Sequence, residues 1–300
     1  MMTIAQLRTF LSASRHMSFS RAAEELHLTQ PAVSAQIVAL ENSVKAKLFE
    51  RMGKKIALTD AGRIATVAAE EILRRIDQFE SELADLNALG AGSLKIGASH
   101  VLGIYLLPSI LADFRAQYPN SELVVRVDTT RKIIDMVLRN ELDLAVIAEG
   151  TPFHDERLAI KPIARDELIV IAPPNHPLAE AGAISPDTLC EAPFVSPARD
   201  SASAESMFEQ LRTQGITLHS VLEMGNISAV KRAVESGLGI SIVSRHAVER
   251  ELREGLLVSL TINGITLQRD LSLCWHHDRR FSKLATVFIQ FIQQQLRDHT

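Results

Sequence analysis

The sequence predicts an α/β protein in three parts: a small helical head, one long helix, and a two-lobed body of alternating strands and helices. Three observations lead to this prediction. The head contains an amphipathic helix in a stretch, residues 26–40, that lacks Asp, Glu, Lys and Arg. Residues 59–89 contain no proline and repeat their apolar side chains at helical spacing. From residue 93 onward, apolar strand-like runs alternate with amphipathic helical segments, which is the pattern of α/β folds.

Length and composition place the chain among ordinary globular proteins. Its 300 residues suggest about two domains, and 46% are hydrophobic while 23% are charged. We find no apolar run long enough for a transmembrane helix, and the first 20 residues lack the apolar core of a signal peptide. We therefore expect a cytoplasmic protein that does not enter the membrane. Cys190 and Cys274 lie far apart in sequence and are expected to be inert buried thiols, not a disulfide or metal motif.

The net charge of −4 conceals an asymmetry between the head and the body. Residues 1–60 contain eight basic and five acidic side chains, so this segment carries +3 and the remainder −7. A basic head on an acidic body favours a module that binds a polyanion.

The head begins with two short capped helices. Thr3 and Gln6 have the spacing of a capping box, and Ser18 is a suitable cap for a second helix. A tight turn then leads to a third helix, which Thr29 caps and in which Pro31 fits only the first turn. Two short helices joined by a small turn are the elements of a helix-turn-helix.

The third helix has an apolar core face and an unusual outer face. Val33, Ile37 and Leu40 form the core stripe at 100° per residue. The opposite face carries small uncharged side chains, namely Pro31, Ala35 and Val38. Such a face is either buried in the protein or docks against a partner. Since two short helices supply too little apolar mass to bury it, we expect a partner.

The next segment predicts the wing of a winged helix-turn-helix over residues 1–58. Gly53 is expected at a hairpin tip, flanked by basic side chains that can contact phosphates, while the helix enters the major groove. Small groups suit the groove floor, because alanine and valine pack on thymine methyls and glutamine and serine bond base edges. The predicted DNA-binding residues are Gln30, Pro31, Ser34, Ala35, Gln36, Val38, Arg51, Lys54 and Lys55.

Residues 59–89 predict one long linker helix. The apolar seam of Ala65, Ala69, Ile72, Ile76, Phe79, Leu83 and Leu86 follows a heptad repeat. A sustained 3.5-residue period favours pairing with a second copy over packing on the protein's own body. The predicted dimerisation residues are Ile72, Ile76, Phe79, Leu83 and Leu86.

Residues 90–300 predict the two-lobed α/β domain. We expect lobe I over about 93–163 and 268–300 and lobe II over about 164–267. Ligands in such folds bind near the carboxyl ends of strands and the N-termini of helices.

The residues of the head resemble one family in particular. "SFSRAAEELHLTQPAVSAQIVALE", followed by "LFER" and "LTDAG", is similar to LysR-type transcriptional regulators, and "ELDLAVIAE" and "VESGLGISIVS" resemble that family's effector domain. The resemblance covers essentially the whole chain. It implies a DNA-binding dimer, often a tetramer, that recognises inverted repeats and acts with RNA polymerase. It also implies a sensor domain like the type 2 periplasmic binding proteins, with a small-molecule effector between the lobes.

Three segments match the cleft-lining loops of that family, and a fourth, Phe194 to Ser196, would supply the facing wall. Each of the three ends a strand and precedes or opens a helix, where free backbone N–H groups favour an anion, and hydroxyl and amide groups add donors. We therefore expect a small polar or anionic effector and no cofactor or metal. The predicted effector-binding residues are Ser99, His100, Thr129, Thr130, Phe194, Ser196, Asn226 and Ser228.

Two further features of the sequence bear on the family. Val44-Lys45 stands where the family usually has Leu-Gly, which predicts strain in the turn after the third helix or a different helix end. "GIYLLPSILADFRAQYPNSEL" resembles the branch that governs assimilation of carbon, sulfur or nitrogen.

No catalytic constellation is predicted. Asp143 and Glu149 have no nucleophile beside them, and the adjacent His276 and His277 have poor metal-binding geometry. The alternative function is a two-lobed small-molecule binding protein or enzyme with an N-terminal dimerisation appendage. We predict a transcriptional regulator and not an enzyme.

Overall fold

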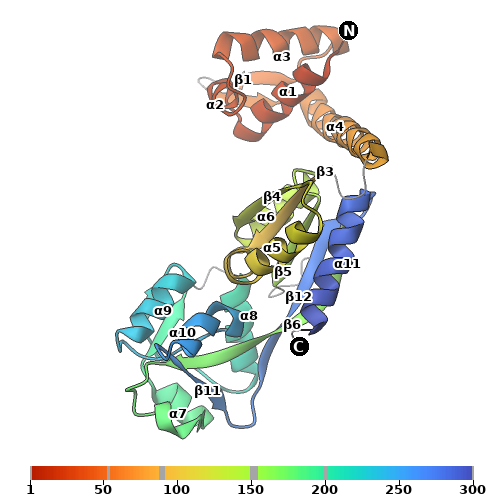
Figure 1. Ribbon diagram of the computed structural model, residues 1–300. Coiled ribbons are helices and arrows are strands. Elements are labelled where there is room, and N and C mark those ends of the chain that lie inside the picture. Colours follow the sequence, from red (N-terminus) through yellow and green to blue (C-terminus); the bar gives the residue numbers. More distant parts are fainter. Residues whose placement is uncertain (1, 53–54, 88–91, 149–154, 199–201, 299–300) are drawn as a thin grey trace. The chain divides into compact units, whose positions relative to one another are not determined.

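A computed structural model describes residues 2–52, 55–87, 92–148, 155–198 and 202–298 of the chain (Figure 1). The chain divides into two compact units, Met1–Leu86 and Asn87–Thr300, and each is described by itself below.

The first unit contains four helices and a hairpin within the described residues. Its elements are α1 (Ile4–His16), α2 (Phe19–Glu25), α3 (Gln30–Val44), β1 (Phe49–Met52), β2 (Lys55–Leu58) and α4 (Asp60–Asn87). The predicted caps are confirmed: Thr3 and Gln6 form a capping box, and Ser18 and Thr29 accept backbone N–H groups of α2 and α3. Pro31 lies in the first turn of α3, as predicted.

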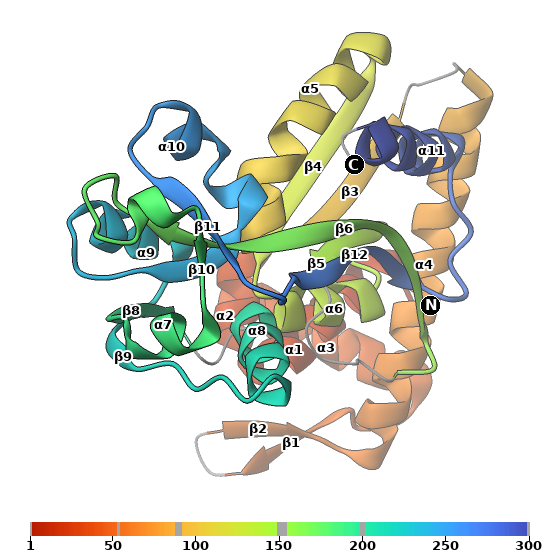
Figure 2. The ribbon, with the colours of Figure 1, turned by 90° about the horizontal axis from the view of Figure 1, so that it is seen from below.

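The core of this unit forms between α1, α2, α3 and the hairpin. Val33, Ile37 and Leu40 are buried in it, which confirms the predicted core face of α3. The ring of Phe49 packs edge-on against Phe10 and Phe19, with centroids 5.5 and 5.3 Å apart. This contact joins β1 to α1 and α2. The antiparallel pair β1–β2 forms the hairpin expected for a wing (Figure 2).

The turn after α3 has the strained conformation that its sequence suggests. Lys45 ends the helix with φ 56° and ψ 33°, in the left-handed region. This conformation costs a residue with a Cβ about 1 kcal/mol or more compared with glycine. The N–H groups of Lys45 and Ala46 both donate to the Glu41 carbonyl, so the turn keeps the backbone hydrogen bonds of a helix end.

The helix α4 changes surroundings along its length. Ala69 is buried, and Ala65 and Leu73 pack against the core of the head. Other apolar side chains of the helix remain exposed in the single chain: Ile64, Val67, Ile72 and Phe79. The first members of the predicted seam therefore pack on their own unit, while Ile72 and Phe79 do not. The side chains of Leu83 and Leu86 lie outside the described residues.

The second unit is built from alternating strands and helices. Its first elements are β3 (Gly92–Ser99), the π-helical turn η1 (Leu102–Leu106), α5 (Leu107–Gln117), β4 (Ser121–Asp128), α6 (Thr130–Leu138), β5 (Leu144–Ala148), β6 (Leu158–Ala172), the 3₁₀ turn η2 (Ala179–Ala181), β7 (Ala183–Ile184) and α7 (Pro186–Glu191). The remaining elements are β8 (Phe194–Pro197), α8 (Ala202–Thr213), β9 (Ser220–Met224), α9 (Ile227–Glu235), β10 (Ser241–Ser244), the 3₁₀ turn η3 (Arg245–Ala247), α10 (Glu249–Arg253), β11 (Val258–Ile262), β12 (Leu267–His276) and α11 (Lys283–Asp298).

Separate apolar cores define two lobes in this unit. In lobe I, α5 and α11 cover one face of the β3, β4, β5 and β12 sheet, and α6 covers the other. In lobe II, the cores form around the far ends of β6 and β12 together with α7, α8 and α9. Within the described residues the mixed sheet runs in the order β4-β3-β5-β12-β6-β11-β7, with β10 also paired to β6.

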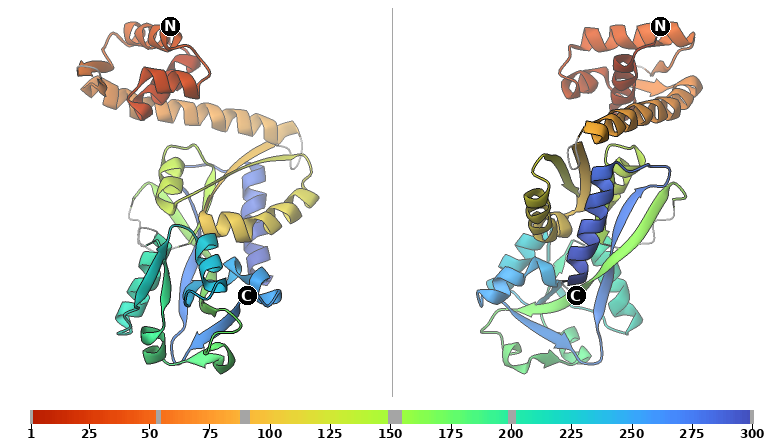
Figure 3. Two further views of the ribbon diagram at one scale, coloured as in Figure 1. Left: turned by 90° about the vertical axis from the view of Figure 1, so that its left-hand side faces the viewer. Right: turned by 45° about the vertical axis from the view of Figure 1, so that its right-hand side comes forward.

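Two long antiparallel strands, β6 and β12, pass from one lobe to the other (Figure 3). The passage is marked by polar residues between the two apolar cores. Arg269 is opposite Asp166, and their side chains form a buried ion pair with Nη2 and Oδ2 2.7 Å apart. Ser244 of β10 donates a hydrogen bond of 2.7 Å to the other oxygen of Asp166. The carboxylate is therefore fully paired where the chain changes lobes.

Candidate nucleic-acid interface and effector site

The outer face of α3 is exposed and uncharged. Gln30, Pro31 and Ala35 are exposed, Val38 is 46% exposed, and Ser34 is half-buried. The structure therefore leaves five of the predicted DNA-facing side chains accessible along one helix. The opposite side of α3 is held by the core, so this face has a fixed orientation within the head.

Gln36 has a different environment from its neighbours. Its Oε1 accepts a hydrogen bond of 2.6 Å from the Thr9 hydroxyl, which ties α3 to α1. The carbonyl oxygen of the Gln36 amide is therefore engaged in a contact within the head. The predicted wing residues cannot be placed in the same way, because Lys54 and the side chains of Arg51 and Lys55 lie outside the described residues.

Glu41 connects the end of α3 to the wing, a role that the sequence did not suggest. One of its oxygens accepts the backbone N–H groups of Leu48 and Phe49 at 2.9 and 3.3 Å. Its other oxygen lies 2.6 Å from Lys47 Nζ. Burial raises the pKa of Glu41, but the hydrogen bonds from Lys47, Leu48 and Phe49 outweigh burial and hold the pKa below its ordinary value.

Two predicted effector segments meet at the edge of lobe I. Strands β3 and β4 are parallel, and Ser99 is opposite Asp128, so Ser99-His100 and Thr129-Thr130 leave the sheet side by side. The Ser99 hydroxyl is buried and has no hydrogen-bond partner among the described residues. Thr129 is the N-cap residue of α6, yet in this part of the structure its side chain makes no capping hydrogen bond. Both hydroxyls are thus left for another partner.

The charges at this edge are balanced. Asp128 accepts the Thr129 N–H, and this bond, with contributions from Lys132 and His100, holds the pKa of Asp128 below its ordinary value despite partial burial. Lys132 Nζ lies 3.2 Å from the carboxylate. The carboxylate next to the two hydroxyls therefore has cations close to it.

The predicted segments of lobe II meet at the ends of β8 and β9. Ser196 is opposite Glu223 in this parallel pair, and Asn226 follows as the cap of α9, accepting the Ala229 N–H at 2.9 Å. Ser228 in the first turn of α9 is exposed. Ser196, in contrast, is buried and donates to the neighbouring Pro197 carbonyl at 2.8 Å.

Phe194 was predicted as part of the wall facing the cleft, and the structure places it elsewhere. Its side chain is completely buried in the lobe II core and packs against Phe208, with centroids 6.5 Å apart. A strand residue alternates sides with its neighbours, so Phe194 fills the core and its side chain forms no cleft wall.

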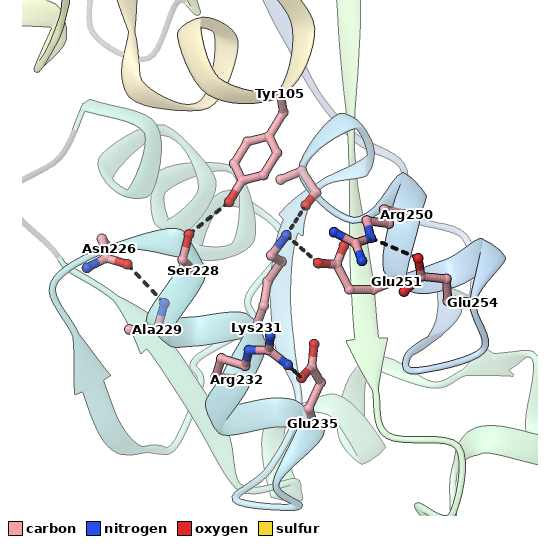
Figure 4. Close-up of polar contacts among 11 residues, drawn as sticks. Tyr105, Asn226, Ser228, Ala229, Lys231, Arg232, Glu235, Arg250, Glu251 and Glu254 are labelled. Carbon is pink, nitrogen blue, oxygen red and sulfur yellow. Dashed lines mark hydrogen bonds and ion pairs between the residues drawn. The ribbon is translucent and has the colours of Figure 1, made fainter.

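Two further residues, Tyr105 and Lys231, were not singled out from the sequence. The Tyr105 hydroxyl lies 3.0 Å from the Ser228 hydroxyl, and its ring covers the Lys231 ammonium (Figure 4). Tyr105 belongs to lobe I, whereas Ser228 and Lys231 belong to α9 of lobe II. Tyr105 and Ser228 are 123 positions apart in the sequence, so no local signal indicated this contact.

Three consecutive residues after β12 could offer ligand atoms to a metal. His276, His277 and Asp278 bring such atoms within 4.8 Å of one another. Nδ1 of His276 accepts the Asp278 N–H at 3.3 Å, and His277 Nε2 lies 3.0 Å from an Asp278 oxygen. The expectation of no metal there remains a prediction.

Comparison with known proteins identifies both units. Residues 4–63 match the family model for bacterial regulatory helix-turn-helix proteins of the lysR family, and residues 87–297 match the LysR substrate binding domain. The chain belongs to the LysR family of transcriptional regulators. The LysR resemblance of the sequence, the predicted fold class and the prediction of a regulator in place of an enzyme are therefore confirmed.

Individual proteins match this LysR regulator over the whole chain or over its second unit. The RuBisCO operon transcriptional regulator of Allochromatium vinosum is 36% identical over 290 residues, which cover 97% of this chain and 95% of that protein. A full-length OxyR variant from Pseudomonas aeruginosa matches with a TM-score of 0.73 at 24% identity, covering 99% of this chain and 95% of the other. The Synechocystis CcmR regulatory domain in complex with 2-PG has a TM-score of 0.62 at 24% identity and covers 69% of this chain and 98% of that domain.

None of the helices in the described ranges combines the length and the apolar character needed to cross a membrane.

Proposed function

We propose that this LysR regulator controls transcription of a RuBisCO operon in response to a small anion. The target operon is suggested by the Allochromatium vinosum relative, which aligns over almost the full length of both chains. The single observation that carries the DNA-binding role is the outer face of α3, where Gln30, Pro31, Ala35 and Val38 are exposed without a charged side chain. Such a face fits the floor of the major groove, and Gln30, at the helix start, can reach adenine.

The same proposal includes an assembly. Ile64, Val67, Ile72 and Phe79 form an exposed apolar surface on α4, and pairing two copies of α4 would bury it. A symmetric dimer presents two copies of α3 to an inverted-repeat site. We propose that two such dimers form a tetramer that contacts RNA polymerase at the promoter, in the cytoplasm.

The effector is proposed to bind between the lobes, on the hydroxyls of Ser99, Thr129, Thr130 and Ser228. The buried hydroxyl of Ser99 supports this site, because a buried polar group without a partner is disfavoured unless a ligand completes it. The first turns of α6 and α9 add free backbone N–H groups, which favour an anion. His100 can add a positive charge, and neither Phe194 nor Ser196 is required.

Replacement of Ala35 by glutamate tests the DNA-binding role. In Ala35→Glu a carboxylate would face the groove floor and the phosphates, and like-charge repulsion of several kcal/mol should weaken operator binding more than about a hundredfold. Ala116→Glu, on the exposed surface of α5 in the other unit, adds the same charge away from α3 and should bind like the wild type. Footprinting on the promoter of the RuBisCO operon from the same organism measures operator binding by both variants. Normal binding by Ala35→Glu would exclude α3 as the reading helix.

Replacement of Thr130 by valine tests the effector site. Calorimetric titration with 2-PG, shikimate and inorganic phosphate should show binding of a small anion to the full chain. Thr130→Val removes one donor and should lower that affinity by about 1–3 kcal/mol. Thr217→Val, an exposed position in the loop before β9, is the matched control and should leave it unchanged. Wild-type affinity in Thr130→Val would remove this residue from the site.

A further inference from the structure

Tyr105 connects the two lobes through two different contacts. Its hydroxyl lies 3.0 Å from the Ser228 hydroxyl, and its ring centroid lies 4.5 Å from Lys231 Nζ (Figure 4). Ser228 and Lys231 are three residues apart in α9, so they share one face of that helix. A single side chain of lobe I thus contacts two residues on one face of α9.

The environment of Lys231 explains why the ring of Tyr105 is held there. Lys231 is buried, and its ammonium donates to the Ala247 carbonyl and to Glu251, both at 2.7 Å. An ammonium group has three donors, and the third can point at the ring. Because a buried cation has lost its water, an aromatic face within about 6 Å is a favourable partner. If Tyr105 moved away from α9, the third N–H of the Lys231 ammonium would lose its aromatic partner.

The backbone of lobe I fixes the position of Tyr105. Tyr105 lies in η1, where the chain makes a π-helical turn between β3 and α5. A Cβ at Gly103 would lie 2.5 Å from a Val127 methyl, so η1 packs against β4 at a distance that only glycine allows. Single π-helical turns within helices are frequent at functional sites. This turn directs Tyr105 toward lobe II.

We propose that Tyr105 is an interlobe latch that holds α9 against lobe I in the effector-free protein. The inference rests on the proposed function, because Ser228 lies in the segment assigned to the effector. In this proposal an anion at the first turn of α9 takes the place of the Tyr105 hydroxyl at Ser228, so effector binding and release of the latch are one event. Tyr105 is then a positioning residue that sets how the lobes respond to the effector.

Hydrogen–deuterium exchange of the full chain without effector tests the latch. Tyr105→Phe keeps the ring over Lys231 and loses only the hydroxyl bond, so exchange at the hydrogen-bonded amides of α9, from Ala229 onward, should accelerate about two- to tenfold. Ser228→Ala should produce the same acceleration, and the double variant should add nothing further. Tyr105→Leu also loses the ring contact and should exchange faster than Tyr105→Phe. Tyr118→Phe, the matched control, changes a tyrosine that packs on Phe114 within lobe I.

The two tyrosines of the chain also permit a spectroscopic test. In a Tyr118→Phe background, 3-fluorotyrosine labels Tyr105 alone, and its ¹⁹F resonance should shift when Lys231→Met or Ser228→Ala is introduced. An unchanged resonance, wild-type exchange in Tyr105→Phe, or additive effects of Tyr105→Phe and Ser228→Ala would overturn the latch. These measurements use neither DNA nor effector, so they are independent of footprinting and titration, whose failure would overturn the proposed function instead.

Discussion

At the residue scale, Glu41 connects α3 to the start of β1. Its carboxylate accepts two backbone N–H groups at the start of β1 that no other described side chain satisfies in the structure. Glu41→Ala should therefore destabilise the head by about 1–3 kcal/mol. Glu41→Gln keeps an acceptor oxygen and should lose less. Lys47→Ala removes an exposed partner and should change stability by less than about 1 kcal/mol. Chemical denaturation of the three variants measures this order.

The same carboxylate predicts a pH dependence. Its pKa in the folded protein lies below the ordinary value of 4.5, so the folded state favours the ionised form. Its contribution to stability should be fully present above pH 4.5 and lost as the pH falls through the lowered pKa. The difference in stability between the wild type and Glu41→Gln should therefore be constant at neutral pH and shrink in acid. A difference that grows on acidification would contradict this account of Glu41.

At the element scale, one part of α4 packs on the head and another part is available for pairing with a second copy. A single heptad pattern covers both parts, so the sequence does not distinguish them. The buried side chains of α4 pack on the head, whereas Phe79 is 60% exposed and available for a second copy. Phe79→Asp should weaken the dimer by several kcal/mol, because pairing would bury a charge, and DNA affinity should fall with it. Phe79→Leu retains an apolar side chain and should remain dimeric. Analytical ultracentrifugation of both variants decides the question, and a normal oligomer in Phe79→Asp would assign Phe79 to another surface.

Elements with local signals were predictable from the sequence, and those that depend on distant residues were not. The caps at Thr3, Ser18 and Thr29 are set by residues three or four positions away, and all three are confirmed. The full length of β6 has no such local signal. The strand runs from Leu158 to Ala172 through the charged run Arg165-Asp166-Glu167, and Asp166 pairs with Arg269, 103 residues away.

The effector site shows the same division. The strand ends that carry Ser99 and Thr129 follow from the α/β alternation, and the structure places them side by side. The burial of Lys231, in contrast, has no local signal in the sequence. Lys231 is buried because Ala247, Glu251 and Tyr105 surround its ammonium, and they come from three other elements. Phe194 was misplaced for the opposite reason, since strand alternation alone does not tell which side faces the cleft.

At the scale of the regulatory unit, the two lobes are joined by β6 and β12, which pass from one lobe to the other side by side. Glu167 and Gln268 are neighbours across the ladder, so the chain leaves lobe I and returns to it at one place. Lobe II is in this sense an insertion whose two ends are adjacent. A segment with adjacent ends can be lengthened, shortened or exchanged for another without reconnecting the host fold. The lobe II part of the proposed effector site can therefore diverge by exchange of this one segment, while lobe I keeps its fold.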